Sequence, residues 1–166
     1  MDLETERLRL RDWRPDDAAV VLDILSRVDV VRWLDDGEPK LLADLDEARA
    51  KIASWQQLVP PLRQWAIEVR ETGAVAGWAC LVPIPGSGGL VQIGWTLHPD
   101  AHGHGYATEA ARAVLAHGLA SGLTEIRALM IPANEPSVRV AQRLGMRDIG
   151  TTDLWYDGPS RVFVTP

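Results

Sequence analysis

Cysteine and long apolar runs are scarce in this sequence, and each scarcity excludes a class of protein. Cys80 is the only cysteine, so we expect neither an intrachain disulfide nor a multi-cysteine metal cluster. It lies in an apolar run, which indicates a buried, unreactive thiol. No stretch approaches the roughly 18 uninterrupted apolar residues of a membrane span. The first residues lack the apolar core of a secretory signal, so we expect a cytoplasmic protein without a membrane partner.

Positive charge is also in short supply. The chain has 17 basic and 23 acidic residues, for a net charge of -6, and only Lys40 and Lys51 are lysines. An acidic chain has no overall field for a nucleic-acid backbone, so we expect no nucleic-acid partner. The same acidity can attract a cationic amine.

The length and composition are those of one globular domain. The 166 residues can bury a core without disulfides, and 46% of them are hydrophobic. No repeat, low-complexity tract or linker divides the chain, so we expect a single domain over residues 1–166. The aromatic set is unusual, with 7 Trp against 2 Tyr and 1 Phe. Trp65 and Trp78 fall on predicted strands and are expected in the core.

Hydrophobic periodicity predicts a mixed α/β fold with the order β-α-α-β-β-β-α-β-α-β-β. An antiparallel meander followed by a β-α-β segment indicates a mostly antiparallel sheet of about seven strands, flanked by about four helices. A loop is expected over residues 35–39. Strands are predicted at residues 7–11, 64–70, 75–82, 90–97, 126–131, 147–152 and 161–164, and helices at residues 15–25, 42–55, 107–118 and 134–144.

The most informative segment is a glycine-rich loop between a strand and a helix, at residues 102–107 (HGHGYA). Glycines let the backbone approach a ligand, and the first amides of a helix have no intrahelical partner, so the loop predicts a phosphate or pyrophosphate site. The alternative is a tight turn that binds nothing. A Walker loop is excluded because no lysine occurs here. A dinucleotide fingerprint fits only at Gly103 and Gly105, since Thr108 stands at its third glycine.

Three segments resemble one known family. The loop resembles the acetyl-CoA loop of the GNAT acetyltransferases, Gln/Arg-x-x-Gly-x-Gly/Ala, with Gly105 and Ala107 matching and His102 replacing the usual Gln or Arg. Residues 134–146 are similar to the family pattern Asn-x-x-Ser-x-x-x-x-x-x-Leu-Gly-Phe, with Met146 in place of Phe. Residues 4–11 (ETERLRLR) resemble the opening of the RimJ/RimL branch, the ribosomal-protein N-terminal acetyltransferases. The segments appear in family order and cover nearly the whole chain.

The resemblance implies an N-acetyltransferase that moves an acetyl group from acetyl-CoA directly to a primary amine in a ternary complex. The amine would belong to a protein N-terminus or a small molecule. Two strands would splay at the acetyl-CoA site, and a backbone N–H near Leu97 would stabilise the charge on the thioester oxygen. The residues implied in acetyl-CoA binding are Trp95, Thr96, Leu97, His102, Gly103, His104, Gly105, Tyr106, Ala107, Thr108, Asn134, Ser137 and Arg143.

The catalytic residues are less defined. By resemblance, Ser137 is the acid that protonates the leaving thiolate, while its position after Asn134 equally suits a helix cap. Many relatives carry a glutamate on the strand before the loop, but Gln92 stands on that strand and cannot act as a base. His98 is our candidate base because its ordinary pKa suits the task. Glu68 and Asp157 are alternatives, and no base is needed if the amine arrives neutral.

The remaining expectations concern the acceptor and other ligands. Trp33, Glu68 and Trp155 are expected to contact the acceptor amine. His102 and His104 are two residues apart without a clear third ligand, so no metal is expected. The assembly is expected to be a monomer or a homodimer. The competing functions are a non-catalytic acyl-CoA sensor and, with less support, a dinucleotide-binding fragment.

Overall fold

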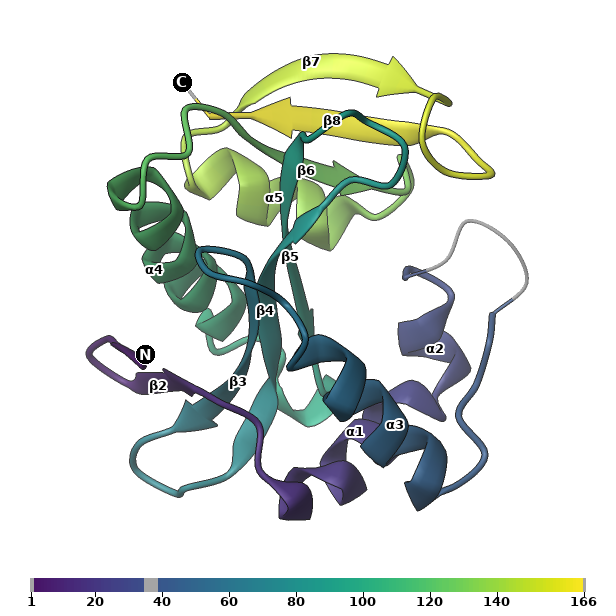
Figure 1. Cartoon of the computed structure of the whole chain (residues 1–166), viewed down its shortest axis with the longest axis vertical. Helices are drawn as coiled ribbons and strands as arrows, with labels where there is room; N and C mark the ends of the chain where they lie inside the picture. Colours follow the sequence, from purple (N-terminus) through teal and green to yellow (C-terminus); the bar gives the residue numbers. More distant parts are fainter. Residues whose placement is uncertain (1, 35–38, 166) are drawn as a thin grey trace.

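A computed structural model describes residues 2–34 and 39–165, in which one eight-stranded sheet lies between two groups of helices (Figure 1). The strand order is β1-β2-β3-β4-β5-β6-β8-β7. Only the β5–β6 pair is parallel among the described strands. The predicted mixed, mostly antiparallel fold is therefore confirmed.

The strands are β1 (Leu3–Glu4), β2 (Leu8–Arg11), β3 (Arg63–Val69), β4 (Val75–Pro83), β5 (Val91–Leu97), β6 (Ile126–Met130), β7 (Arg147–Thr152) and β8 (Ser160–Val164). The α-helices are α1 (Ala18–Leu25), α2 (Val28–Val31), α3 (Leu45–Trp55), α4 (Tyr106–Ala120) and α5 (Glu135–Arg143). Two short 3₁₀ turns, η1 (Pro15–Asp17) and η2 (Pro99–Ala101), precede α1 and α4.

The structure adds two elements to the predicted order and shortens a third. β1 and α2 have 2 and 4 residues, too few to show a hydrophobic period. The third helix begins at Leu45 rather than near residue 42, because the Asp44 side chain accepts hydrogen bonds from the amides of Asp46 and Glu47 and caps it there. Four residues of the predicted loop at 35–39, residues 35–38, lie outside the described part of the chain.

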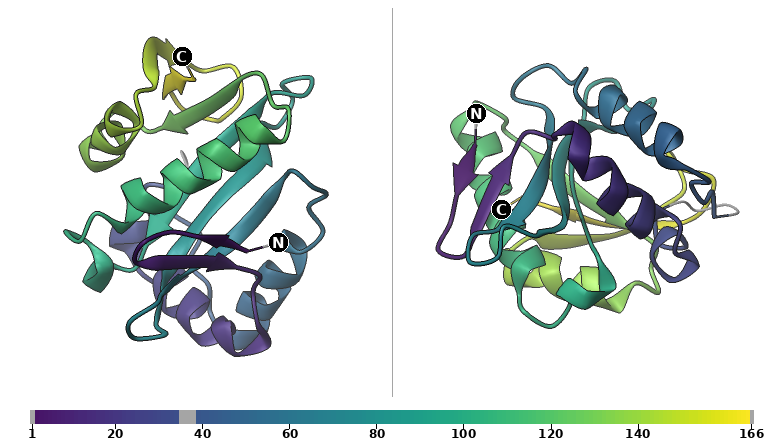
Figure 2. Two further views of the ribbon diagram at one scale, coloured as in Figure 1. Left: turned by 90° about the vertical axis from the view of Figure 1, so that its left-hand side faces the viewer. Right: turned by 90° about the horizontal axis from the view of Figure 1, so that it is seen from below.

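Two hydrophobic cores lie on opposite faces of the sheet. Helices α4 and α5 cover one face and α1–α3 cover the other (Figures 1 and 2). The alternation along β3 divides its side chains between them: Trp65 and Ile67 pack toward α4, whereas Ala66 packs toward α1 and α3. The predicted burial of Trp65 and Trp78 is confirmed, at 1% and 6% exposed.

Three tryptophans account for much of the second core. The Trp13 and Trp55 ring centroids are 5.1 Å apart, and those of Trp55 and Trp78 are 5.3 Å apart. Tilted aromatic pairs at these distances add to the free energy gained from burial alone. The tryptophan excess is therefore partly structural. Trp78 belongs to this core and also lines the cavity described below.

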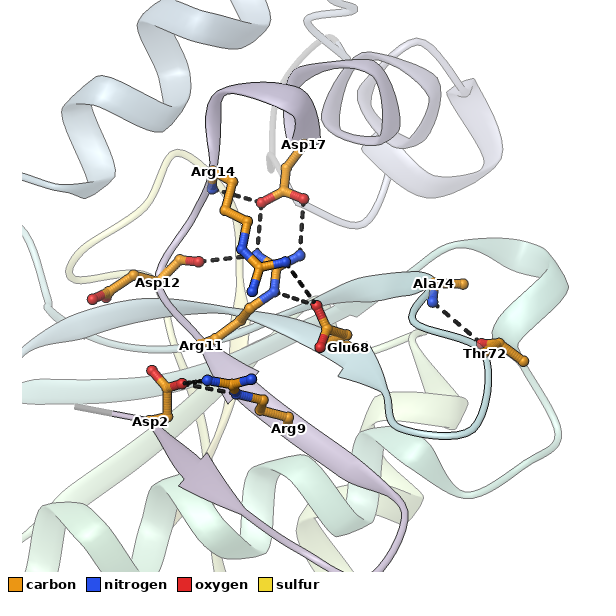
Figure 3. Close-up of polar contacts among 9 residues, drawn as sticks. All are labelled: Asp2, Arg9, Arg11, Asp12, Arg14, Asp17, Glu68, Thr72 and Ala74. Atoms are coloured by element: carbon orange, nitrogen blue, oxygen red, sulfur yellow. Dashed lines mark hydrogen bonds and ion pairs between the residues drawn. The ribbon is translucent and has the colours of Figure 1, made fainter.

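A buried cluster of charges joins β2, β3 and the start of α1 (Figure 3). The Arg11 guanidinium is 4% exposed and donates to both carboxylate oxygens of Asp17, at 2.8 and 3.0 Å. It also donates to Glu68 at 2.5 Å, and Arg14 reaches the same Glu68 oxygen at 3.4 Å. Paired in this way, each buried charge is compensated by a partner of opposite sign.

Candidate active site

The parallel pair at the centre of the sheet opens after two residue pairs. β5 and β6 are in register only at Val91–Ile126 and Gln92–Arg127. β6 then continues along β8, and the two ribbons diverge (Figure 1). Among the described residues, β5 beyond Gln92 has no strand neighbour on its β6 side. The predicted splayed strand pair is therefore present.

The ladder with β4 sets which backbone groups of β5 face this opening. The His98 amide donates to the Ala76 carbonyl at 2.8 Å, at the end of the antiparallel β4–β5 register. Hydrogen-bonded and non-hydrogen-bonded pairs alternate along such a ladder. The Thr96 amide therefore points toward β4, whereas the amides of Trp95 and Leu97 point toward the gap.

The glycine loop brings the N-terminus of α4 to the same opening. Gly105 occupies the N-cap position with φ 79°, a left-handed conformation that favours glycine. It offers no side chain to the first amides of α4, so these donors remain available to a ligand. By contrast, the first turns of α3 and α5 are capped by Asp44 and Asn134.

A cavity of about 1230 Å³ joins these parts. Its walls come from β4, β5, the end of β6, the starts of α4 and α5, and α2. Every residue expected to bind acetyl-CoA lines it: Trp95, Thr96, Leu97, His102, Gly103, His104, Gly105, Tyr106, Ala107, Thr108, Asn134, Ser137 and Arg143. Residues distant in sequence thus meet at one site.

Basic side chains gather at the helical end of the cavity. Arg112 on α4 lines this end together with Arg139 and Arg143 on α5. Arg112 donates to the Arg143 carbonyl at 3.2 Å, which ties the two helices together here. The uncapped α4 N-terminus adds its partial positive charge, so this end of the cavity suits an anion.

The other end of the cavity lies over β4 on the face covered by α1–α3. Cross-strand partners share a face of a sheet, and two such pairs line this end: Trp78 with Thr96, and Cys80 with Gly94. Burial raises the pKa of the Cys80 thiol to about 12, so it remains protonated at neutral pH. Its predicted burial is confirmed.

Helix α2 and the turn that follows it supply the rim at this end. Asp29 and Trp33 both line the cavity. The guanidinium of Arg32 lies 4.3 Å from the centroid of the Trp33 ring, so one face of that ring already carries a cation. This rim therefore combines a carboxylate with an aromatic surface.

The sequence left open whether Ser137 caps a helix or acts as the catalytic acid. The structure assigns the cap of α5 to the Asn134 side chain. The Asn134 side chain caps α5 by accepting from the backbone amide of Ser137 at 3.3 Å. The Ser137 hydroxyl makes no hydrogen bond to another described residue. The cap thus uses the Ser137 backbone and leaves its hydroxyl at the cavity wall.

Four of the residues predicted for catalysis or acceptor binding do not line the cavity: His98, Glu68, Trp155 and Asp157. His98 contacts Asp23 through Nε2 at 2.9 Å, and its Nδ1 accepts from the Asp100 amide at 3.1 Å, so both ring nitrogens are engaged in holding the turn before α4. Glu68 belongs to the buried Arg11 cluster (Figure 3). Trp155 packs against Arg127, 5.4 Å from the guanidinium to the ring centroid. The geometry gives these predicted roles no support.

Asp29 lines the cavity although sequence reasoning did not select it, and Tyr156 lines the cavity within residues 154–161, a segment expected to frame the acceptor pocket. The Gln92 side-chain amide donates to the Tyr156 hydroxyl, which draws the β7–β8 loop to the point where β5 and β6 part. No local sequence pattern marked Tyr156, because only the fold brings this loop to Gln92. The weak signal for Asp29 was its place four residues before Trp33, which was expected to contact the acceptor.

Residues 2–34 and 39–165 contain no group of three or more His, Cys, Asp or Glu side chains placed to hold a metal ion. They also contain no helix long and apolar enough to cross a membrane.

The splayed parallel pair, with its open edge at a glycine loop and a helix N-terminus, gives the architecture of the site, and comparison with known proteins gives the family. Residues 7–147 match the acetyltransferase (GNAT) domain. The chain is 31% identical over 158 residues to an uncharacterized protein, YkkB of Bacillus subtilis, covering 92% of this chain and 89% of that protein. It is 28% identical over 151 residues to the uncharacterized N-acetyltransferase YnaD of the same organism, covering 90% and 85%. The chain therefore belongs to the GNAT acetyltransferases.

Solved structures share the fold over nearly the whole chain. A GNAT-family acetyltransferase from Bacillus anthracis superposes with a TM-score of 0.82 at 24% identity, covering 99% of this chain and 98% of that one. RimL, a ribosomal L7/L12 α-N-protein acetyltransferase solved with coenzyme A, superposes with a TM-score of 0.81 at 16% identity, covering 99% and 97%. The predicted likeness to the RimJ/RimL branch is consistent with this neighbour.

Proposed function

We propose that this acetyltransferase moves the acetyl group of acetyl-CoA directly to a primary amine, with both substrates bound in the cavity. The observation that carries the proposal is the meeting of two sets of outward-facing amides. Those of Trp95 and Leu97 face the strand gap, and those of the first turn of α4 face the same cavity. The first set suits an extended amide-containing arm, and the second suits a diphosphate.

The residues present fit acetyl-CoA along its length. The loop at residues 103–108 would hold the diphosphate through backbone amides, and Arg143 with Arg139 would meet the ribose phosphate. The Leu97 amide would donate to the thioester oxygen as negative charge develops there, which is the interaction that most directly accelerates acyl transfer. These assignments rest on position, since all of these residues line the cavity.

The acceptor amine would enter from the opposite end, past α2. Asp29 and Trp33 offer a carboxylate and an aromatic face there, and both attract a protonated amine. In the transfer, the bound ammonium first loses one proton to water, and the resulting neutral amine nitrogen bonds to the acetyl carbon as the carbon–sulfur bond breaks. The nitrogen then gives up a second proton and the departing thiolate takes one. A protein N-terminus and a small-molecule amine both meet these requirements.

We assign the proton for the thiolate to Ser137, whose hydroxyl is at the cavity wall. General acid catalysis contributes about 10²–10⁴-fold, so Ser137→Ala should lower kcat by about 10²-fold or more while leaving the acetyl-CoA Kd near the wild-type value. Because the α5 cap uses the backbone amide of Ser137, the alanine variant keeps the cap and the same melting temperature. Unchanged turnover and pH profile in Ser137→Ala would remove this assignment.

The function itself is tested by ligand and acceptor. Thermal shift with acetyl-CoA, CoA and NADH should show stabilisation by the first two alone. Thiol release from acetyl-CoA is then followed across a panel of N-terminal peptides and small amines. Stabilisation by NADH alone would exclude an acetyltransferase. Acetyl-CoA binding without thiol release for any amine would instead favour a non-catalytic acyl-CoA sensor. Gln92 supports that alternative, because it stands on the strand where many relatives carry a glutamate.

A further inference from the structure

The turn between β1 and β2 holds the glycine loop through one arginine, Arg7. Its Nη1 donates to the His104 carbonyl at 2.9 Å, and its Nε donates to Glu109 at 2.8 Å. The guanidinium also lies 5.0 Å from the centroid of the Tyr106 ring. One side chain from the first strand pair thus contacts the loop, the first residue of α4 and the end of its first turn.

Glu109 is fully engaged in this contact. Its Oε1 accepts from the Arg7 amide at 2.9 Å and from the Thr5 hydroxyl at 2.6 Å. Its Oε2 lies 2.6 Å from Arg7 Nη2. Burial alone would disfavour the charge on Glu109, but the bonds from Thr5 and Arg7 outweigh that effect and hold its pKa below the usual value.

These contacts have two consequences for an anion at the start of α4. Glu109 is a cavity-lining carboxylate close to the helix N-terminus, so without a counter-charge it would repel a diphosphate. Arg7 neutralises it. Arg7 also draws the His104 carbonyl toward β2, which fixes the peptide plane before Gly105 while that residue holds its left-handed conformation. A carbonyl held there leaves the donors of the loop, rather than its acceptors, for the anion.

We propose that Arg7 is a positioning residue for the diphosphate of the acyl donor, acting through the His104 carbonyl and Glu109. This inference rests on the proposed use of acetyl-CoA. It gives a physical role to Arg7, one of the three arginines in the segment 4–11. The Arg7 side chain faces the loop, whereas Leu8 and Leu10 enter the core. An arginine is required because only its planar fork reaches both partners at once.

The test uses a matched control, Arg9, which lies on β2 two residues after Arg7. Arg9 is also partly exposed and also forms an ion pair, with Asp2 at 2.7 Å (Figure 3), but it does not line the cavity. Isothermal titration should show that Arg7→Ala weakens acetyl-CoA binding about tenfold or more, whereas Arg9→Ala stays close to wild type. Arg7→Lys, which keeps the charge but not the fork, should fold and still bind several-fold more weakly. Wild-type affinity in either Arg7 variant overturns the proposal.

A truncated donor separates positioning from general destabilisation. S-acetylpantetheine has the thioester and the amide arm but no diphosphate, so Arg7→Ala should leave its kcat/KM unchanged while raising the acetyl-CoA KM. An equal loss with both donors would mean that Arg7 only supports the fold. Hydrogen exchange of the ligand-free protein gives a second readout, with faster exchange at residues 103–108 expected in Arg7→Ala but not in Arg9→Ala. Equal exchange in both variants counts against the proposal.

The outcome also distinguishes this proposal from the proposed function. If the wild-type protein does not bind acetyl-CoA, the proposed function fails. If the wild type binds acetyl-CoA and Arg7→Ala binds it equally well, only the role of Arg7 fails.

Discussion

Removing the charge of Asp17 should destabilise the protein more than any comparable change at its surface. Asp17→Asn keeps the size of the side chain but removes the negative charge that accepts both hydrogen bonds from Arg11. It also weakens the bond from the Arg14 amide, which is 2.7 Å from the same carboxylate. Arg11 would then stay 4% exposed with Glu68 as its remaining carboxylate partner.

The size of the effect follows from burial. Breaking a buried ion pair by changing one partner costs about 3–5 kcal/mol, because the other charge stays buried without compensation. The retained bond to Glu68 places Asp17→Asn near the lower end, about 3 kcal/mol. A chain of this length loses roughly 2–4 °C of melting temperature per kcal/mol, so the expected decrease is about 6–12 °C. Total stabilities of about 5–15 kcal/mol leave the variant folded in the usual case.

Chemical denaturation and thermal melts measure this effect, with Asp2→Asn as the control. Asp2 pairs with Arg9, which lies on β2 with Arg11, but both side chains are partly exposed (43% for Arg9 and 30% for Asp2), so screening should leave the control close to wild type (Figure 3). A decrease in Asp17→Asn no larger than that in Asp2→Asn would refute the reasoning.

The pH dependence supplies a second check on the same carboxylate. Burial opposes the charge on Asp17, yet the hydrogen bonds from Arg11 and the Arg14 amide prevail and lower its pKa. A lowered folded-state pKa stabilises the protein fully above the unfolded value of about 3.9, and the stabilisation is lost as the pH falls through the folded value. The gap between wild type and Asp17→Asn should therefore be constant from neutral pH down to about pH 5 and shrink below about pH 4.

Two further predictions concern the cavity. A Cβ at Gly77 would lie 2.1 Å from the Thr96 carbonyl oxygen, and the φ of Gly77 is 146°. Gly77→Ala should therefore lower the free energy of unfolding by about 2–4 kcal/mol, and it should raise the acetyl-CoA KM because the open edge of β5 is displaced. Wild-type stability and a wild-type KM would contradict this prediction. Trp33→Ala should raise the acceptor KM with little change in the acetyl-CoA KM, whereas Trp155→Ala, outside the cavity lining, should change neither; steady-state kinetics with both substrates varied would reject the assignment if the two variants behaved alike.

The elements with a clear period or a strong local signal were predictable from sequence. β4, β5, α4 and α5 have continuous or periodic apolar residues and end near proline, glycine or asparagine signals, so their limits were found to within about two residues. α2, with 4 residues, was missed because one turn carries no period. The uncapped start of α4 was also readable, because glycine at 103 and 105 acts through local backbone geometry.

The buried charges show where sequence reasoning fails. Glu68 stands on the polar side of an alternating strand, which favoured an exposed residue available to a substrate. In the structure the same alternation places the Glu68 side chain on the face of the sheet where the Arg11 side chain extends from the neighbouring strand β2 and pairs with it. The pairing register that makes this contact joins residues 57 positions apart, and no local pattern carries it. His98 illustrates the same point, since its partner Asp23 lies on α1.

This contrast explains why every residue predicted for the donor lines the cavity, whereas among those predicted for the acceptor only Trp33 does. A diphosphate is bound mainly by backbone amides at a helix start, and the sequence that builds such a start is contiguous and constrained by φ. An acceptor is selected by side chains. The side chains that we propose for this are Asp29 on α2, Trp33 just beyond α2 and Tyr156 on the β7–β8 loop, which meet only after the sheet is complete. Because these loops are not required to form the donor site, they can vary without disturbing it. Acceptor choice in this protein should therefore respond to substitutions at these three positions independently of acetyl-CoA binding.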